Sequence, residues 1–148
     1  MNIMRLTSEN EYWDQTIKLA EQCTWSAGPN LAKRMKENDF YDFECPFAAV
    51  ENNQVIGFCV ITKTDYIPDC AYTPWIGFVF VAEQARGKRV SQKMVEAVLA
   101  YAKTKGFEKI YVCTEEEGLY EKYGFVQIDS LKSYDDTMET IFVYDLSF

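Results

Sequence analysis

The sequence contains no histidine, and this absence excludes several kinds of chemistry. Ser-His and Cys-His nucleophilic machinery and imidazole metal clusters all require histidine side chains. Any proton transfer must therefore use a carboxylate, tyrosine, lysine, cysteine or water. The cysteines number five, are scattered and form no CxxC pair, so we expect neither a disulfide framework nor a metal site.

Long apolar runs and net positive charge are also lacking. No stretch reaches the roughly 18 apolar residues of a membrane helix, and the first residues show no signal peptide. We therefore expect a cytoplasmic protein without a membrane partner. The formal net charge of −8 argues against a nucleic-acid partner. It suits a cationic small molecule, although acidity can equally serve solubility alone.

The composition that remains is globular, and the chain of 148 residues suits a single domain over 1–148. The apolar pattern predicts an α/β domain with the order βααβββαβαββ. Strands are expected at 3–6, 46–50, 54–62, 75–81, 109–114, 125–131 and 140–146, and helices at 8–23, 29–40, 89–105 and 114–123. Two S/T-x-x-E capping boxes, Ser8 with Glu11 and Thr114 with Glu117, predict helix starts. The run WIGFVFV predicts a strand buried on both faces, and the strand–helix–strand unit that it begins predicts a parallel pair.

The segment EQARGKRV, after that run, is the first candidate binding site. The first backbone N–H groups of the following helix have no partner inside it and form an anion site with the helix dipole. Gly87 lets a ligand approach the backbone. Basic residues surround the turn: Arg86, Lys88, Arg89 and Lys93. Neither a P-loop nor a GxGxxG fingerprint is present, and an ordinary basic turn explains the segment equally well when it is taken alone.

The segment GLYEKYGF, from Gly118 to Phe125, is the second candidate. Tyr120 lies within a short predicted helix, and a tyrosine is protonated at neutral pH, so it can donate a proton to a leaving group. The chain has ten tyrosines, and most tyrosines are core or surface residues. By itself this segment is weak evidence for catalysis.

Together the two segments resemble the GNAT superfamily of acyl-CoA-dependent N-acyltransferases. The family motif Q/R-x-x-G-x-G/A corresponds to Gln84 through Arg89, and TPWIGFVFV and LYEKYGF match in type and spacing. The resemblance covers 45–146 well and the N-terminal helices only by length and order. Arg89 departs from it, because the family has a small residue there.

The resemblance implies a mixed, mostly antiparallel sheet whose central parallel pair is splayed to hold coenzyme A. Acetyl-CoA is the implied co-substrate, and no metal is implied. The amide of Val79 or Phe80 would polarise the thioester carbonyl. Tyr120 would be the general acid, with Tyr123 as its rival. The implied cofactor-binding residues are Phe78, Val79, Phe80, Val81, Arg86, Gly87, Lys88, Arg89, Val90 and Ser91.

The base and the acceptor site are less defined. Asp65 and Asp69 are candidate bases acting through water, although loop solvation explains them as well; the acids 115–117 are better explained by the helix dipole. Candidate acceptor-site walls, each also compatible with core packing, are Trp25, Phe40, Tyr41, Phe43 and Trp75. Asp39, Asp42 and Glu44 could attract a cation.

The resemblance leaves alternative functions open. We expect acetyl transfer to a primary amine of a small, cationic acceptor, with a protein amine still possible. An acyl-CoA-binding module without turnover and a basic-turn interaction domain are the competing hypotheses. A homodimer through the C-terminal strand is possible, but that strand can equally close the sheet.

Overall fold

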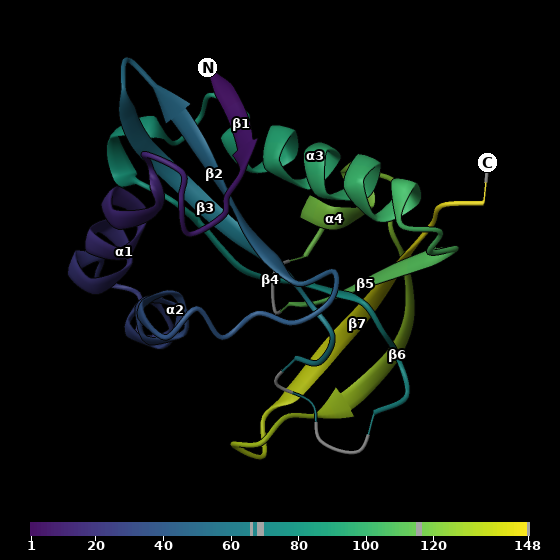
Figure 1. Cartoon of the computed structure of the whole chain (residues 1–148). Helices are drawn as coiled ribbons and strands as arrows, with labels where there is room; N and C mark the ends of the chain where they lie inside the picture. Colours follow the sequence, from purple (N-terminus) through teal and green to yellow (C-terminus); the bar gives the residue numbers. More distant parts are fainter. Residues whose placement is uncertain (66, 68–69, 115–116, 148) are drawn as a thin grey trace.

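The computed structural model describes residues 1–65, 67, 70–114 and 117–147, which contain a seven-stranded sheet in the order β1-β2-β3-β4-β5-β7-β6 (Figure 1). The element order confirms the predicted βααβββαβαββ. The elements are β1 (Asn2–Arg5), α1 (Trp13–Gln22), α2 (Gly28–Lys36), β2 (Cys45–Glu51), β3 (Gln54–Thr62), β4 (Trp75–Val81), the 3-10 turn η1 (Glu83–Ala85), α3 (Val90–Thr104), β5 (Lys109–Thr114), α4 (Leu119–Lys122), β6 (Val126–Lys132) and β7 (Met138–Asp145).

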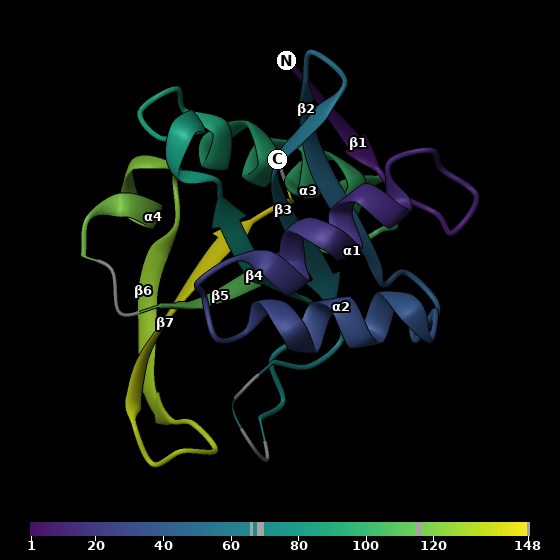
Figure 2. The same cartoon turned by 90° about the vertical axis from the view of Figure 1, so that its left-hand side faces the viewer.

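Helices cover both faces of the sheet. On one face α3 packs against β2, β3 and β5 through residues such as Met94, Val98 and Ile110. On the other face α1 and α2 pack against β2 and β3 through Trp13 and Leu31 (Figure 2). A third cluster, which includes Ile67, Trp75, Tyr111 and Ile141, joins the β3–β4 loop to the sheet. Of the helices described, none is long and apolar enough to cross a membrane.

Both capping-box predictions are wrong. The chain first turns on Asn10, whose side-chain oxygen accepts the amide of Tyr12, so α1 begins only at Trp13. Near the second box, α4 begins at Leu119 after Gly118, whose amide donates to the Glu121 carboxylate at 3.2 Å. Asn10 before α1 and Gly118 before α4 therefore make the turns that the predicted pairs were expected to make.

The strand pairing confirms the parallel unit and corrects one burial prediction. All neighbouring strands are antiparallel except β4 and β5, which α3 connects. β4 is buried on both faces only at Trp75 and Ile76, whereas 77–81 are half-buried. The first two residues of the apolar run therefore lie in the core, and 77–81 border an opening.

Candidate active site

The opening arises because β4 and β5 separate after a single paired position. Trp75 is opposite Tyr111, whose amide donates to the Pro74 carbonyl at 3.0 Å, and no further register pair joins the described residues of these strands. β4 also has an extra residue against β3, between Gly77 and Phe80, where Phe78 has a φ of +54°. Such a bulge bends a strand and increases its twist. The sheet is therefore splayed at its parallel pair.

The splay leaves backbone groups of β4 facing the space between the two strands. The Ala82 amide donates to the Ile56 carbonyl of β3 at 2.8 Å. Because N–H groups of an antiparallel strand point alternately to its two sides, those of Val81 and Val79 face the opening. The Val81 carbonyl accepts a hydrogen bond from Arg86 Nε at 3.2 Å. This edge of β4 can receive an extended chain as an added strand.

The turn before α3 presents consecutive amides at the end of this opening. Within the described residues, the backbone amides of 87–92 have no hydrogen-bond partner, whereas those of Ala85 and Arg86 bond back to Ala82 and Glu83. A helix N-terminus with free amides carries a partial positive charge and binds anions. Arg86, Lys88 and Arg89 are exposed around it and add full positive charges.

Two residues of the turn have left-handed backbone conformations. Gly87 has a φ of +84°, and no atom of the described residues lies within 4 Å of the place where a Cβ would stand. Arg89, immediately before α3, has a φ of +61° and a ψ of +29°. This conformation costs a side-chain-bearing residue about 1–2 kcal/mol and explains why a small residue suits the position. Arg89 therefore occupies a strained left-handed conformation at the position where the family has a small residue.

The two tyrosines of LYEKYGF take different places. Tyr120 is only 5% exposed and packs edge-to-face against Tyr123 and Phe125, with ring centroids 5.7 and 5.5 Å apart. Tyr123 is half-buried, and its hydroxyl lies 2.9 Å from Ser91 Oγ in the first turn of α3. Tyr123, at the end of α4, therefore contacts the first turn of α3, while Tyr120 belongs to the core cluster that α3 covers.

Comparison with known proteins agrees with this geometry. The model of the acetyltransferase (GNAT) family matches residues 9–125. The chain belongs to the GNAT acetyltransferase family. A curated relative, N-alpha-acetyltransferase 30 of Schizosaccharomyces pombe, is 28% identical over 96 residues, and this match spans 62% of the chain and 63% of the relative. The match therefore covers less than two thirds of that protein.

Solved structures of the same fold extend over nearly the whole chain. One is an aminoglycoside 6′-acetyltransferase type Ii, with 20% identity, a TM-score of 0.76 and coverage of 99% of this chain and 97% of that one. Another is an aminoglycoside 6′-N-acetyltransferase complexed with coenzyme A, with 17% identity, a TM-score of 0.73 and the same coverage. At these identities the likeness establishes the fold.

The candidate base Asp65 lies over the opening in this GNAT chain. Its Oδ2 is 3.7 Å from the position that a Cβ on Gly77 would take, and it accepts a hydrogen bond from Cys113 Sγ at 3.6 Å. Gly77 belongs to β4 and Cys113 to β5, so the carboxylate spans the two strands where they separate. The other candidate base, Asp69, lies outside the described residues, as do Glu115 and Glu116.

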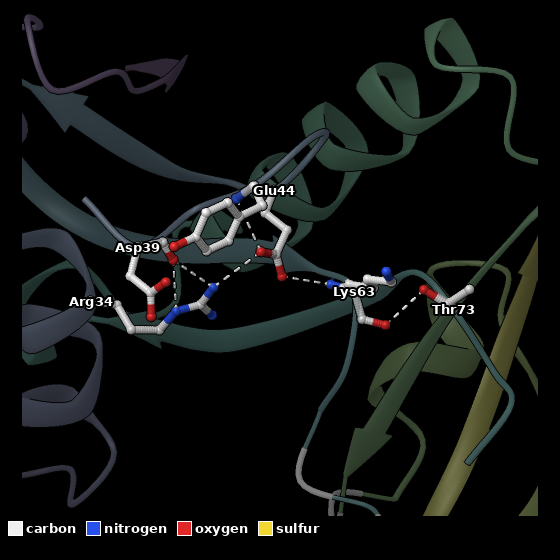
Figure 3. A network of polar contacts seen from close by, with 6 residues as sticks. Arg34, Asp39, Glu44, Lys63 and Thr73 are labelled. Carbon is white, nitrogen blue, oxygen red and sulfur yellow. Dashed lines mark hydrogen bonds and ion pairs between the residues drawn. The ribbon is translucent and has the colours of Figure 1, made fainter. Parts of the chain in front are cut away.

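The loop that carries Asp65 is fastened at its base by a polar network (Figure 3). Thr73 Oγ1 donates to the Lys63 carbonyl at 2.7 Å, which joins the two ends of the loop. The Glu44 carboxylate accepts the Lys63 amide at 2.8 Å and pairs with Arg34 at 3.4 Å. Glu44 therefore holds loops together, and its attraction of a substrate cation stays a prediction.

The five candidate acceptor-site aromatics are dispersed, and Phe40 packs on Trp13 of α1 with ring centroids 6.0 Å apart. Trp25 stacks on Phe80 of β4 at 6.3 Å, beside the opening. Trp75 is 1% exposed and lines a cavity that also contains Asp65. Tyr41 is exposed and lines a second cavity, with Asp39 and Asp42. Phe43 packs on Phe107 beyond the C-terminal end of α3, and α3 is about 22 Å long, so Phe43 lies far from the anion-binding turn.

Several residues near the opening belong to no sequence motif. Cys113 and Glu139 lie on neighbouring strands, and Tyr134 lies in the β6–β7 turn. Burial raises the pKa of the Cys113 thiol, and the charges of Asp65 and Glu139 raise it further. The thiol therefore stays protonated and acts as a hydrogen-bond donor, not as a nucleophile. Only strand pairing brings these residues together, so no motif could have revealed them.

Proposed function

We propose that the protein transfers an acetyl group from acetyl-CoA to a primary amine of a small, cationic acceptor, with both substrates bound together. The observation that carries this proposal is the run of amides 87–92 without partners among the described residues, beside the separated β4 edge. A helix N-terminus suits the pyrophosphate of coenzyme A, and an open strand edge suits its pantetheine arm.

The residues present fit this co-substrate. Gly87 leaves open space above the turn, and exposed Arg86, Lys88 and Arg89 supply charge that complements phosphate. Along β4 the backbone of 78–81 is half-buried and offers amides to an extended arm and to the thioester oxygen. We assign phosphate binding to the backbone amides of 87–92, because within the described residues these amides have no hydrogen-bond partner.

The proposed chemistry needs three proton transfers. The acceptor ammonium loses a proton to Asp65, directly or through water, and the free amine attacks the thioester carbonyl carbon. The carbon–nitrogen bond forms and the carbon–sulfur bond breaks, while Tyr120 gives its proton to the leaving sulfur. The nitrogen then loses its second proton, which restores the tyrosine, and one proton is released overall. Holding both substrates in one cleft supplies much of the rate.

The small-molecule acceptor is supported by two observations. Two solved structures of the same fold are named aminoglycoside acetyltransferases, and aminoglycosides are small molecules that carry amines. The net charge of −8 also favours a cationic acceptor over an anionic one.

Thermal unfolding with and without acetyl-CoA tests the proposal first. A ligand that binds only the native state raises its stability, by about 2.7 kcal/mol at 100 times the dissociation constant. We expect a higher melting temperature with acetyl-CoA and thiol release when amines are added. An unchanged melting temperature at saturating acetyl-CoA contradicts the proposal. A shift without thiol release on any amine of a broad panel identifies an acyl-CoA-binding module instead.

A further inference from the structure

A cavity of about 390 Å³ adjoins Asp65 on the face of the sheet opposite α3. It is lined by Thr64, Asp65, Ile67, Cys70, Trp75 and Tyr134, among others. Trp75 pairs with Tyr111 at the last joined position of β4 and β5, so the cavity ends where the strands begin to separate. Its size is that of a small-molecule site and excludes a folded protein domain.

Among the described residues that line this cavity, the charged side chain is the carboxylate of Asp65. The groups that act on the Cys113 thiol, besides burial and its own backbone, are the carboxylates of Asp65 and Glu139. A further carboxylate, Asp129 of β6, accepts the Tyr72 hydroxyl at 3.1 Å. Asp65 is therefore the carboxylate that favours an ammonium group in this cavity, and Glu139 adds negative charge near Cys113.

The wall of the cavity is aromatic and apolar on one side. Trp75 belongs to a packed group with Tyr72 and Tyr111, whose rings stack with centroids 4.6 Å apart. Ile67 is buried beside them, and Tyr134 is 68% exposed at the outer side. An ammonium next to aromatic rings gains cation–π attraction, and an apolar substituent gains burial.

We propose that this cavity is the acceptor site and that the acceptor is a compact primary monoamine with an apolar or aromatic body. Its nitrogen lies on Asp65, and its body lies against Ile67, Trp75 and Tyr134. This inference rests on the proposed acetyl transfer and specifies its substrate class.

A second cavity, of about 410 Å³, offers the competing location. It is lined by Arg34, Asp39, Tyr41, Asp42 and Lys63, among others, and it shares Thr64 with the first cavity. This second cavity suits a polycation better than an apolar body. None of its lining residues comes from β4 or β5, however, whereas a reacting amine must come within about 3–3.5 Å of the acyl carbon. The first cavity contains Trp75 of β4, at the last paired position before the strands separate, and is therefore the one that adjoins the opening.

Substitutions of two equally exposed tyrosines, one at each cavity, distinguish the two locations. Tyr134 and Tyr41 are both 68% exposed, and each lines one of the two cavities. Thiol release is measured with 2-phenylethylamine, spermidine and kanamycin for the wild type, Tyr134→Ala and Tyr41→Ala. We expect 2-phenylethylamine to be the best substrate, and Tyr134→Ala to raise its KM about three- to tenfold, the size of one aromatic contact. Tyr41→Ala should leave that KM unchanged, and neither variant should alter the KM of acetyl-CoA.

Asp65→Asn tests the contact with the nitrogen. We expect kcat/KM for the amine to fall about 100-fold or more, as for loss of a general base, while the thermal shift with acetyl-CoA stays at its wild-type size. Unchanged turnover in Asp65→Asn overturns the inference. So does a strong preference for spermidine or kanamycin accompanied by sensitivity to Tyr41→Ala, which assigns the acceptor to the second cavity. Both results leave acetyl transfer intact, whereas absence of any acetyl-CoA shift in the wild type refutes the proposed function itself.

Discussion

The two sides of the opening between β4 and β5 are built in different ways. On the proposed coenzyme A side, the binding groups are mostly backbone amides, and they come from one continuous segment, 78–92. On the proposed acceptor side, the groups are side chains from the β3–β4 loop, from β5, from β7 and from the β6–β7 turn.

This difference follows from what each side must bind. A pyrophosphate is matched by the amides of a helix N-terminus, whose arrangement is set by local backbone geometry. An amine with a variable body needs a carboxylate and a shaped wall, which side chains from separate elements must supply. One side is therefore constrained by its conformation, and the other can change without altering the fold. This contrast can be tested at both sides.

The largest effect is expected at Tyr120, the proposed proton donor to the leaving sulfur. Tyr120→Phe should lower kcat about 100-fold or more because the leaving sulfur loses its proton donor. The thermal shift with acetyl-CoA should stay the same, because the hydroxyl is not part of the phosphate site. Tyr123→Phe serves as the control: it breaks the contact with Ser91 and should raise the KM of acetyl-CoA with little change in kcat. Full turnover by Tyr120→Phe would assign the proton transfer elsewhere.

The next effect compares two glycines at opposite ends of α3. Gly87 and Gly106 have φ values of +84° and +86°, and the described residues leave open space around both. Replacing either by alanine should cost about 1 kcal/mol of unfolding free energy, measured by urea denaturation. Only Gly87→Ala should weaken acetyl-CoA binding, by about tenfold, because its Cβ enters the space that the phosphates approach. Equal binding by both variants would contradict the placement of the phosphates.

A smaller effect is expected at Arg89. Glycine removes the left-handed strain there, so Arg89→Gly should be more stable by up to about 1 kcal/mol in urea denaturation. Acetyl-CoA binding should weaken only about threefold and depend less on salt, since one exposed cation is lost while the amides remain. Tighter binding by Arg89→Gly would instead mean that the native side chain crowds the phosphates.

The smallest effect concerns Cys113 on the acceptor side. Its pKa is raised, so its thiolate is scarce around pH 8, and its alkylation should be slower than that of an exposed cysteine. The rate should increase as the pH rises well above 9, because deprotonation then becomes favourable. Asp65→Asn removes an anion that disfavours the thiolate and should speed alkylation modestly. Mass spectrometry of iodoacetamide-treated protein measures both rates, and a fast reaction at pH 7 would contradict the raised pKa.

Much of the fold can be predicted from local patterns, and the errors have local causes. The positions of β2, β3 and α3 follow from apolar periodicity, and the parallel pair follows from the strand–helix–strand order. The capping boxes failed because Asn10 and Gly118 offered competing turns within a few residues. The burial of β4 was overestimated because an apolar run does not indicate where a neighbouring strand separates from it.

By itself, the sequence determined the turn that we propose as the coenzyme A side. Gln84 through Arg89, followed by an amphipathic helix, specifies a turn whose amides have no partner within the helix, and LYEKYGF places a tyrosine near it. Only the tertiary structure decided the acceptor side. The bulge at Phe78 and the single pair Trp75–Tyr111 open the sheet, and the fastened loop then places Asp65 beside Cys113. These residues are 48 positions apart in the chain, and their meeting depends on strand pairing that no local pattern encodes.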